Sequence, residues 1–133
     1  MKQKNWYEYL NKSDLDSFYD TIPLLNDIKI YTTEFNPSKG RIVIEIGFNQ
    51  EVDNKPPSWK MHGRKFVKCQ LKFSGISQFG ITNDVNHITE SNSIDIKQQS
   101  DGMFSIISKR ELNFKFFAES YKVDDVTWDF YNN

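Results

Sequence analysis

Few side chains in this sequence have the type and spacing that catalysis or metal binding requires. The two histidines, His62 and His87, lie in polar, turn-like stretches, and the single cysteine is Cys69. A zinc site usually shows its ligands in closely spaced pairs, which these residues do not form. A nucleophilic cysteine needs a histidine as its base, and nothing in the local sequence brings one to Cys69. Because Cys69 alternates in phase with Val67 and Leu71, we interpret it as a small buried residue.

The densest group of carboxylates is Asp124, Asp125 and Asp129, beside Trp128. Acid–base catalysis needs two carboxyl groups at a set separation, in environments that move their pKa values apart. Three acids on an alternating strand and its turn are more often a solvated face. Their functional interpretation is electrostatic recognition of a basic partner.

A modest basic row, Lys65, Lys68 and Lys72 with Arg64 nearby, follows one side of a predicted strand. Nucleic-acid binding would need aromatic side chains interleaved on that side, and only Phe66 is in phase. The chain has 17 basic and 18 acidic residues, and this balance argues against a dominant phosphate-binding surface. We therefore interpret the row as a solvent face that discourages edge pairing, and we expect no nucleic-acid partner.

The common catalytic motifs do not occur. The sequence contains no G-x-G-x-x-G, no P-loop, no G-x-S-x-G and no H-E-x-x-H. The sequence therefore predicts no catalytic residue, no cofactor and no metal ligand, which is typical of a protein that is not an enzyme.

The stretch NKPPSWK, residues 54–60, stands out because two prolines precede a tryptophan. Pro56 and Pro57 restrict the residue before each of them to extended geometry, which suits a connection between strands. Trp59 then has two interpretations. It can plug the end of the core, with its indole N–H donating to a carbonyl or water at the rim, or it can contact a partner directly.

The elements that would position these residues begin with a helix. Ser13 can cap it, and Asp16 follows three residues later as a short form of the capping box. Pro23 ends the helical pattern. We predict a helix over about residues 13–21.

From residue 27 the apolar period changes to two, as a strand buried on one face requires. In the first of these strands we expect Ile28 and Ile30 on one side, and Tyr31, Thr33 and Phe35 on the other. The later stretches place these side chains on one face of each strand: Ile42, Ile44, Ile46 and Phe48; Val67, Cys69, Leu71 and Phe73; Ile94 and Ile96; Leu112, Phe114 and Phe116; Val126, Trp128 and Phe130.

Short strands separated by turns, without crossover helices, favour antiparallel pairing. A single flat sheet of this length would leave an apolar face in water, so the sheet must curl or pack on another layer. We predict an α+β fold that is mostly β: an antiparallel β-sandwich or strongly curved sheet of about eight strands, partly covered by the short N-terminal helix. No repeat, low-complexity tract or linker divides the chain, so we expect one domain over residues 1–133.

The composition also indicates the cellular compartment in which the protein works. A single cysteine rules out an internal disulfide and fits a reducing environment. The sequence shows no signal-peptide core and no apolar run of the roughly 20 residues that a membrane span needs. We expect a soluble, cytoplasmic protein without a membrane partner.

The order of these elements resembles the immunity protein 50 family of bacterial polymorphic toxin systems. The matching stretches are WYEYL (6–10), LDSFYDTIPLLNDIKI (15–30), PPSWK (56–60) and KFVKCQLKFSGI (65–76). Beyond them, the chain matches only in the rhythm of its strands. Two stretches depart from the pattern: residues 64–66 replace a more polar entry to the strand, and residues 82–100 are unusually polar.

This resemblance implies a protein that binds a cognate protein toxin, made by the same or a sister cell, and neutralises it by stoichiometric occlusion without turnover. Tight inhibition requires an aromatic or arginine anchor among complementary charges. We therefore predict Trp59, Asp124, Asp125 and Asp129 as partner-binding residues. The oligomeric state stays open.

Two other functions are compatible with the sequence. One is a β module that binds a small ligand or a carbohydrate by stacking it on exposed aromatic side chains. It requires Trp59 and Trp128 to be exposed and coplanar along one groove. The other is a small enzyme whose residues converge only in the fold, and it requires a pocket that holds His62 or His87 beside a carboxylate.

Overall fold

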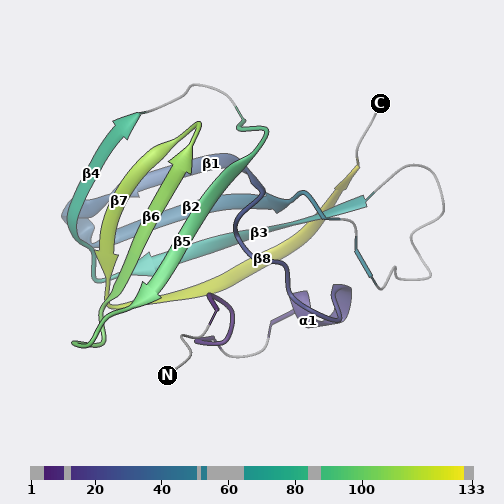
Figure 1. Ribbon diagram of the computed structural model, residues 1–133, viewed down its shortest axis with the longest axis horizontal. Coiled ribbons are helices and arrows are strands. Elements are labelled where there is room, and N and C mark those ends of the chain that lie inside the picture. Colours follow the sequence, from purple (N-terminus) through teal and green to yellow (C-terminus); the bar gives the residue numbers. More distant parts are fainter. Residues whose placement is uncertain (1–4, 11–12, 51, 54–64, 84–87, 131–133) are drawn as a thin grey trace.

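The computed structural model describes residues 5–10, 13–50, 52–53, 65–83 and 88–130, with the backbone alone at residues 37, 65, 66, 83 and 128–130. Within these residues the chain forms one short α-helix, one 3-10 turn and eight strands (Figure 1). In chain order they are α1 (Leu15–Phe18), β1 (Ile28–Asn36), η1 (Pro37–Lys39), β2 (Arg41–Phe48), β3 (Lys65–Ser74), β4 (Ser77–Asn83), β5 (Asn92–Gln98), β6 (Phe104–Arg110), β7 (Asn113–Ala118) and β8 (Ser120–Phe130).

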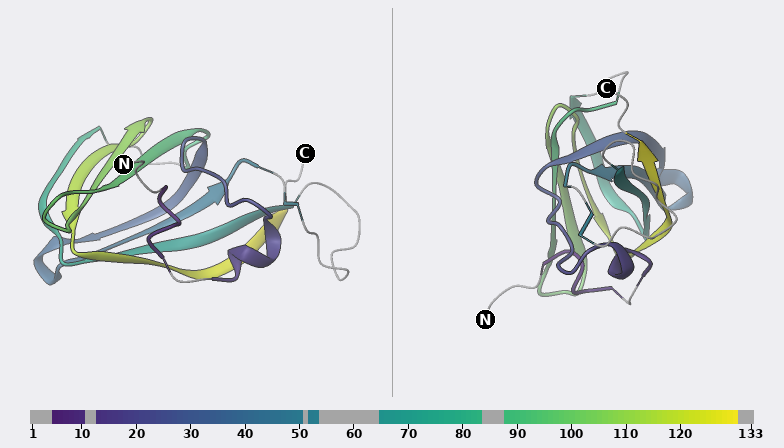
Figure 2. Two further views of the ribbon diagram at one scale, coloured as in Figure 1. Left: turned by 60° about the horizontal axis from the view of Figure 1, so that its bottom comes forward. Right: turned by 90° about the vertical axis from the view of Figure 1, so that its right-hand side faces the viewer.

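The strands form one open antiparallel sheet in the order β4-β7-β6-β5-β1-β2-β3-β8. The sheet folds over between β1 and β5, which share a single backbone pair, Ile28 with Asn92. As a result β4, β7, β6 and β5 (the front layer) lie over β1, β2, β3 and β8 (the back layer), as Figures 1 and 2 show. The predicted fold class, a strongly curved antiparallel sheet of about eight strands with a short helix, is confirmed.

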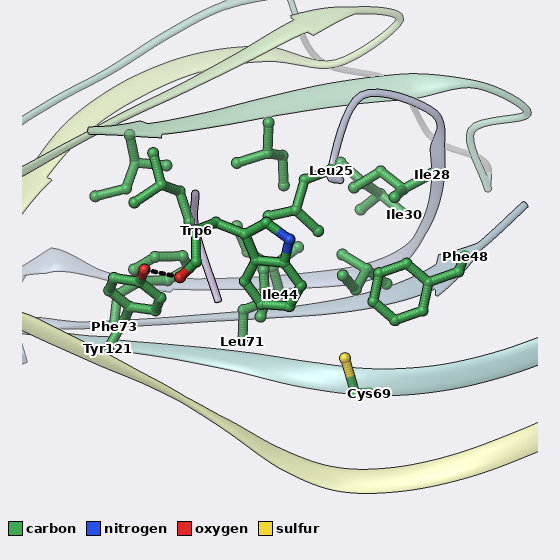
Figure 3. Packing of buried hydrophobic residues seen from close by; sticks show 14 of the residues in the cluster. Trp6, Leu25, Ile28, Ile30, Ile44, Phe48, Cys69, Leu71, Phe73 and Tyr121 are labelled. Carbon is green, nitrogen blue, oxygen red and sulfur yellow. Dashed lines mark hydrogen bonds between the residues drawn. The ribbon is translucent and has the colours of Figure 1, made fainter. Parts of the chain in front are cut away.

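The core lies between the two layers. The eight apolar side chains predicted to face inward from β2 and β3 are all at most 1% exposed. Aromatic rings of the front layer complete the core, with Phe73 edge-to-face on Phe116 at 5.0 Å between ring centroids (Figure 3 shows part of this cluster). Full burial of a side chain of this size contributes about 1.5–3 kcal/mol, so these strands carry much of the stability.

The predicted phase of the first strand is wrong beyond Ile30. The register of β1 against β2 shifts between Ile30 and Thr32, so Tyr31 is the extra residue of a β-bulge. After the bulge, Thr33 and Phe35 lie opposite core residues of β2 and share their face. Phe35 therefore packs against two rings of the front layer, and Tyr31 is left on the outer side.

The helix is shorter than predicted. α1 ends at Phe18, because Tyr19 has an extended backbone with φ −127° and ψ 133°. This turn brings the Tyr19 ring into the core, where it is 2% exposed and its hydroxyl donates to the carbonyl of Gln50 at 2.8 Å. Burial of a large ring thus outweighs one further helical turn.

The side-chain hydrogen bonds predicted for Ser13 and Asp16 form, although the helix begins at Leu15 and Asp14 occupies the N-cap position. The hydroxyl of Ser13 accepts a hydrogen bond from the backbone N–H of Leu15, and the carboxylate of Asp16 accepts one from the backbone N–H of Ser13. The hydroxyl of Tyr7 also donates to Asp16 at 2.9 Å. These bonds tie the N-terminal segment to the start of the helix.

The N-terminal segment, residues 5–10, covers the open side of the core. Trp6 is 4% exposed and its indole N–H donates to the carbonyl of Pro23 at 2.9 Å. The hydroxyl of Tyr121 in β8 donates to the carbonyl of Trp6, the bond drawn in Figure 3. The ring of Tyr9 packs edge-to-face on Phe104 in β6. The segment therefore joins both layers.

Buried polar groups complete the fold beside the contact of β1 with β5. The side-chain carbonyl of Asn92 accepts from the backbone N–H groups of Glu111 and Leu112, and its amide donates to the Ser108 hydroxyl at 2.7 Å. The Thr89 hydroxyl accepts from the backbone N–H of Ile30 at 2.9 Å. No buried side-chain nitrogen or oxygen of the described residues lacks a partner.

We predict that Trp6→Ala lowers the free energy of unfolding by about 3–5 kcal/mol, because it leaves a cavity and removes the bond to Pro23. Urea unfolding followed by circular dichroism measures the loss. Leu24→Ala is the control: that side chain is 54% exposed, so its loss should stay within about 0.5 kcal/mol. Equal effects of the two substitutions would contradict the covering role of the N-terminal segment.

Candidate partner-binding surface

The pairing of β3 with β8 joins the predicted basic row to the predicted acidic group on the outer side of the back layer. The ammonium nitrogen of Lys72 lies 2.9 Å from a carboxylate oxygen of Asp124 and 3.9 Å from one of Asp125. Lys122 lies 4.0 Å from the same oxygen of Asp124. We call these four residues the β3–β8 charge cluster.

A bulge in β8 brings the two acids together. The register of β3 against β8 shifts between Lys68 and Gln70, and Asp125 has a left-handed backbone with φ 49°. Aspartate tolerates this conformation better than most residues, and here its backbone N–H donates to the Asp124 carboxylate. Bulges and charged side chains also hinder the pairing of an edge strand such as β8 with another chain. The cluster thus has a structural role besides any role in binding.

The electrostatics of the cluster are largely internal. The hydrogen bond from Lys72 lowers the pKa of Asp124 below its ordinary value, helped by the backbone N–H of Asp125. The same bond raises the pKa of Lys72. The charge of Asp124 is therefore matched within the chain, whereas Asp125, 61% exposed, is held more loosely.

Of the other two predicted partner-binding residues, the structure describes only the backbone of Asp129 and nothing of Trp59. The backbone of Asp129 pairs with the backbone of Phe66 on β3. The structure describes only the backbone of Asp129 and Trp128, not their side chains. Trp59 lies outside the described residues, so both interpretations of NKPPSWK stay predictions. Of the four predicted residues, the structure brings Asp124 and Asp125 together.

Cys69 is the small buried residue that its phase predicted. Its side chain is 0% exposed, between Val67 and Leu71 on the inner side of β3. Burial raises the pKa of the thiol to about 12, so the group is protonated at neutral pH. A protonated, buried thiol is a poor nucleophile.

Sequence reasoning missed Tyr31, an aromatic side chain on the outer side of the back layer. It points away from the side that Ile28 and Ile30 share, and its ring lies over Gly47 of β2. A Cβ on Gly47 would sit 2.6 Å from the ring, so any other residue there would displace the Tyr31 ring from its position. The ammonium nitrogen of Lys68 lies 4.8 Å from the ring centroid. Gly47 was the signal in the sequence, because a glycine inside a strand often marks a place where another group lies close to the backbone.

Most of the residues that the two alternative functions require are not among those that the structure describes. This applies to both histidines, to Trp59 and to the side chain of Trp128. Among the side chains that are described, no three of His, Cys, Asp or Glu are grouped so that they could hold a metal ion. The described part of the chain contains no helix that is long and apolar enough to cross a membrane.

We predict that the Asp124 carboxyl titrates below the range of an ordinary aspartate. Because its pKa is lower in the folded state, the stabilisation by Lys72 is present above the unfolded-state pKa and disappears as pH falls through the folded-state value. Lys72→Met should raise the Asp124 pKa, measured by NMR titration of the carboxyl carbon. Lys39→Met, on an exposed turn, is the control. An unchanged midpoint in Lys72→Met would show that the ion pair does not form in solution.

Comparison with known proteins agrees with the resemblance seen in the sequence. The model of the family Immunity protein 50 matches residues 11–128, which include α1, β1 to β7 and most of β8. No curated protein and no solved structure matches the chain. Because the family match extends over most of the sequence, the chain belongs to the Immunity protein 50 family.

Proposed function

We propose that this protein neutralises a cognate bacterial toxin by binding it stoichiometrically and occluding its active surface. The observation that carries this proposal is the family match over residues 11–128. In this role the protein belongs to a polymorphic toxin system, works in the cytoplasm and has no catalytic activity of its own. The buried, protonated thiol of Cys69 agrees with a reducing compartment and a non-catalytic role.

The architecture supports inhibition by occlusion. Both layers direct most of their large apolar side chains to one shared core, and the N-terminal segment covers its open side. Such a scaffold presents its outward side chains with little loss of conformational freedom on binding, which favours affinity. Partner choice then depends on the outer sides of the two layers.

The residues predicted from the sequence remain our proposal for one part of the contact. Asp124, Asp125 and Asp129, with the loop around Trp59, would meet basic groups of the toxin. Asp125 is the better placed of the two described acids, because it is 61% exposed and 3.9 Å from Lys72. Since Lys72 already matches the charge of Asp124, we expect the acids to contribute moderately.

We predict that co-expression of this chain with the toxin domain encoded directly upstream of its gene restores growth, and that the purified pair comigrates at a ratio of one to one. Size-exclusion chromatography with light scattering measures the ratio. A chain whose core is disrupted by Phe73→Asp, a side chain that is 0% exposed, is the negative control. Rescue without a complex would exclude occlusion, and a failure of both would exclude this function.

We predict that Asp124→Lys with Asp125→Lys weakens toxin binding about 3- to 10-fold, mainly through slower association, as expected for charges at the rim of an interface. Surface plasmon resonance at two salt concentrations measures both rates. The matched control reverses two exposed acids elsewhere, Asp14→Lys with Asp101→Lys. Unchanged binding would remove Asp124 and Asp125 from the contact and leave the function itself standing.

A further inference from the structure

The outer side of the front layer carries more lysines than acids. Lys97 of β5, Lys109 of β6 and Lys115 of β7 all face outward, because they alternate with buried residues of their strands. A carboxylate oxygen of Asp95 lies 3.4 Å from the ammonium nitrogen of Lys97. Lys109 and Lys115 have no ion pair with any side chain that the structure describes. We call Lys97, Lys109, Lys115, Ile107 and Phe117 the basic face.

Two apolar side chains lie among these lysines. Ile107 is paired across the sheet with Asp95 on one side and with Lys115 on the other, so it occupies the middle of the face. Phe117 follows on β7, with the ammonium nitrogen of Lys115 at 5.8 Å from its ring centroid. Both are half-buried although they point away from the core. An apolar centre ringed by charge is the usual anatomy of a protein interface.

The basic face is also hollowed. A hollow of about 450 Å³ runs between β5 and the segment at Leu24, and a second of about 480 Å³ lies over β4, β6 and β7. Ile107 and Lys109 line both, so the two hollows meet at these residues. Leu24, 54% exposed, lies on the rim of the first. In the second, Gly80 has no atom within 4 Å of the position of a Cβ, which leaves room for a partner.

We infer that the basic face is the main docking surface for the toxin, and that it takes an acidic segment of that protein. Carboxylates of this segment pair with Lys109 and Lys115, and an apolar side chain of the same segment packs on Ile107. This inference rests on the proposed function and names the chemistry of the partner. The β3–β8 charge cluster lies on the outer side of the other layer, so its acidic residues form a separate candidate contact.

Charge complementarity selects this partner. Lysines that have no acid beside them gain most from an incoming carboxylate, whereas Asp124 must first give up its bond to Lys72. A nucleic acid could use the same lysines, but it would also need exposed rings for stacking, and Lys115 lies over Phe117. The net charge of −1 for the whole chain also disfavours a polyanion.

The test reverses the two unmatched charges. Lys109→Glu with Lys115→Glu should weaken binding of the full-length chain to the upstream-encoded toxin domain by at least about 30-fold, with slower association and a weaker dependence on salt. Ile107→Ala should instead speed dissociation, because it removes apolar contact. The control is Lys39→Glu at the turn between β1 and β2, compared with Lys109→Glu and Lys115→Glu made singly, and it should stay within about 3-fold.

Each outcome separates this inference from the proposed function. If the wild-type chain binds the toxin and the Lys109/Lys115 variant, folded by circular dichroism, binds equally well, the basic face is excluded and the function stands. If the wild-type chain does not bind the toxin, the proposed function itself fails. A single-stranded DNA oligonucleotide is the second probe. DNA binding that is lost in the variant while toxin binding is kept would assign the face to a polyanion and overturn the inference.

Discussion

The junction of β1 with β5, where the sheet folds over, is held by buried polar groups. β1 and β5 share one backbone pair there, so the ladder alone gives the junction little support. Across the junction, the buried Thr89 accepts a hydrogen bond from the backbone N–H of Ile30 and donates its own N–H to the Ile30 carbonyl. Within the front layer, the buried side chain of Asn92 bonds two backbone N–H groups of the turn between β6 and β7 and the hydroxyl of Ser108. An unmet buried donor costs about 1–3 kcal/mol, so this network favours one geometry of the junction over others. The placement of one layer over the other depends on the geometry of this junction.

The layered core divides the side chains into two sets with different tasks. The inner set packs ring on ring across the layers, as Phe73 does on Phe116. The outer sets differ between the layers. On the back layer, Lys72 and Asp124 match one another, and Lys68 lies over the ring of Tyr31. On the front layer the lysines exceed the acids, which is why the partner chemistry that we infer is acidic rather than basic.

Alternation of apolar and polar residues predicted best the strands that pair with each other in continuous register. β2 and β3 are the clearest examples. β4 was not identified from the sequence, because its ladder with β7 has two register shifts and Gln78 has a left-handed backbone with φ 52°. β6 was missed because Ile106 and Ile107 are adjacent apolar residues, one facing the core and the other the basic face. In β1, a single extra residue at Tyr31 reversed the phase of everything that followed. Each error has a local cause that the apolar pattern does not record.

The sequence by itself determined that the protein is mostly β, which side chains of β2 and β3 are buried, and which family it resembles. These properties are local, because a period of two assigns side chains to faces without reference to other strands. Only the tertiary structure decided which charges meet. Lys72 and Asp124 are 52 positions apart and touch because β3 pairs with β8, while Lys109 and Lys115 share a face because β6 pairs with β7. Strand order and register are set by long-range packing, so whether a charge is matched or left open to a partner is a property of the fold.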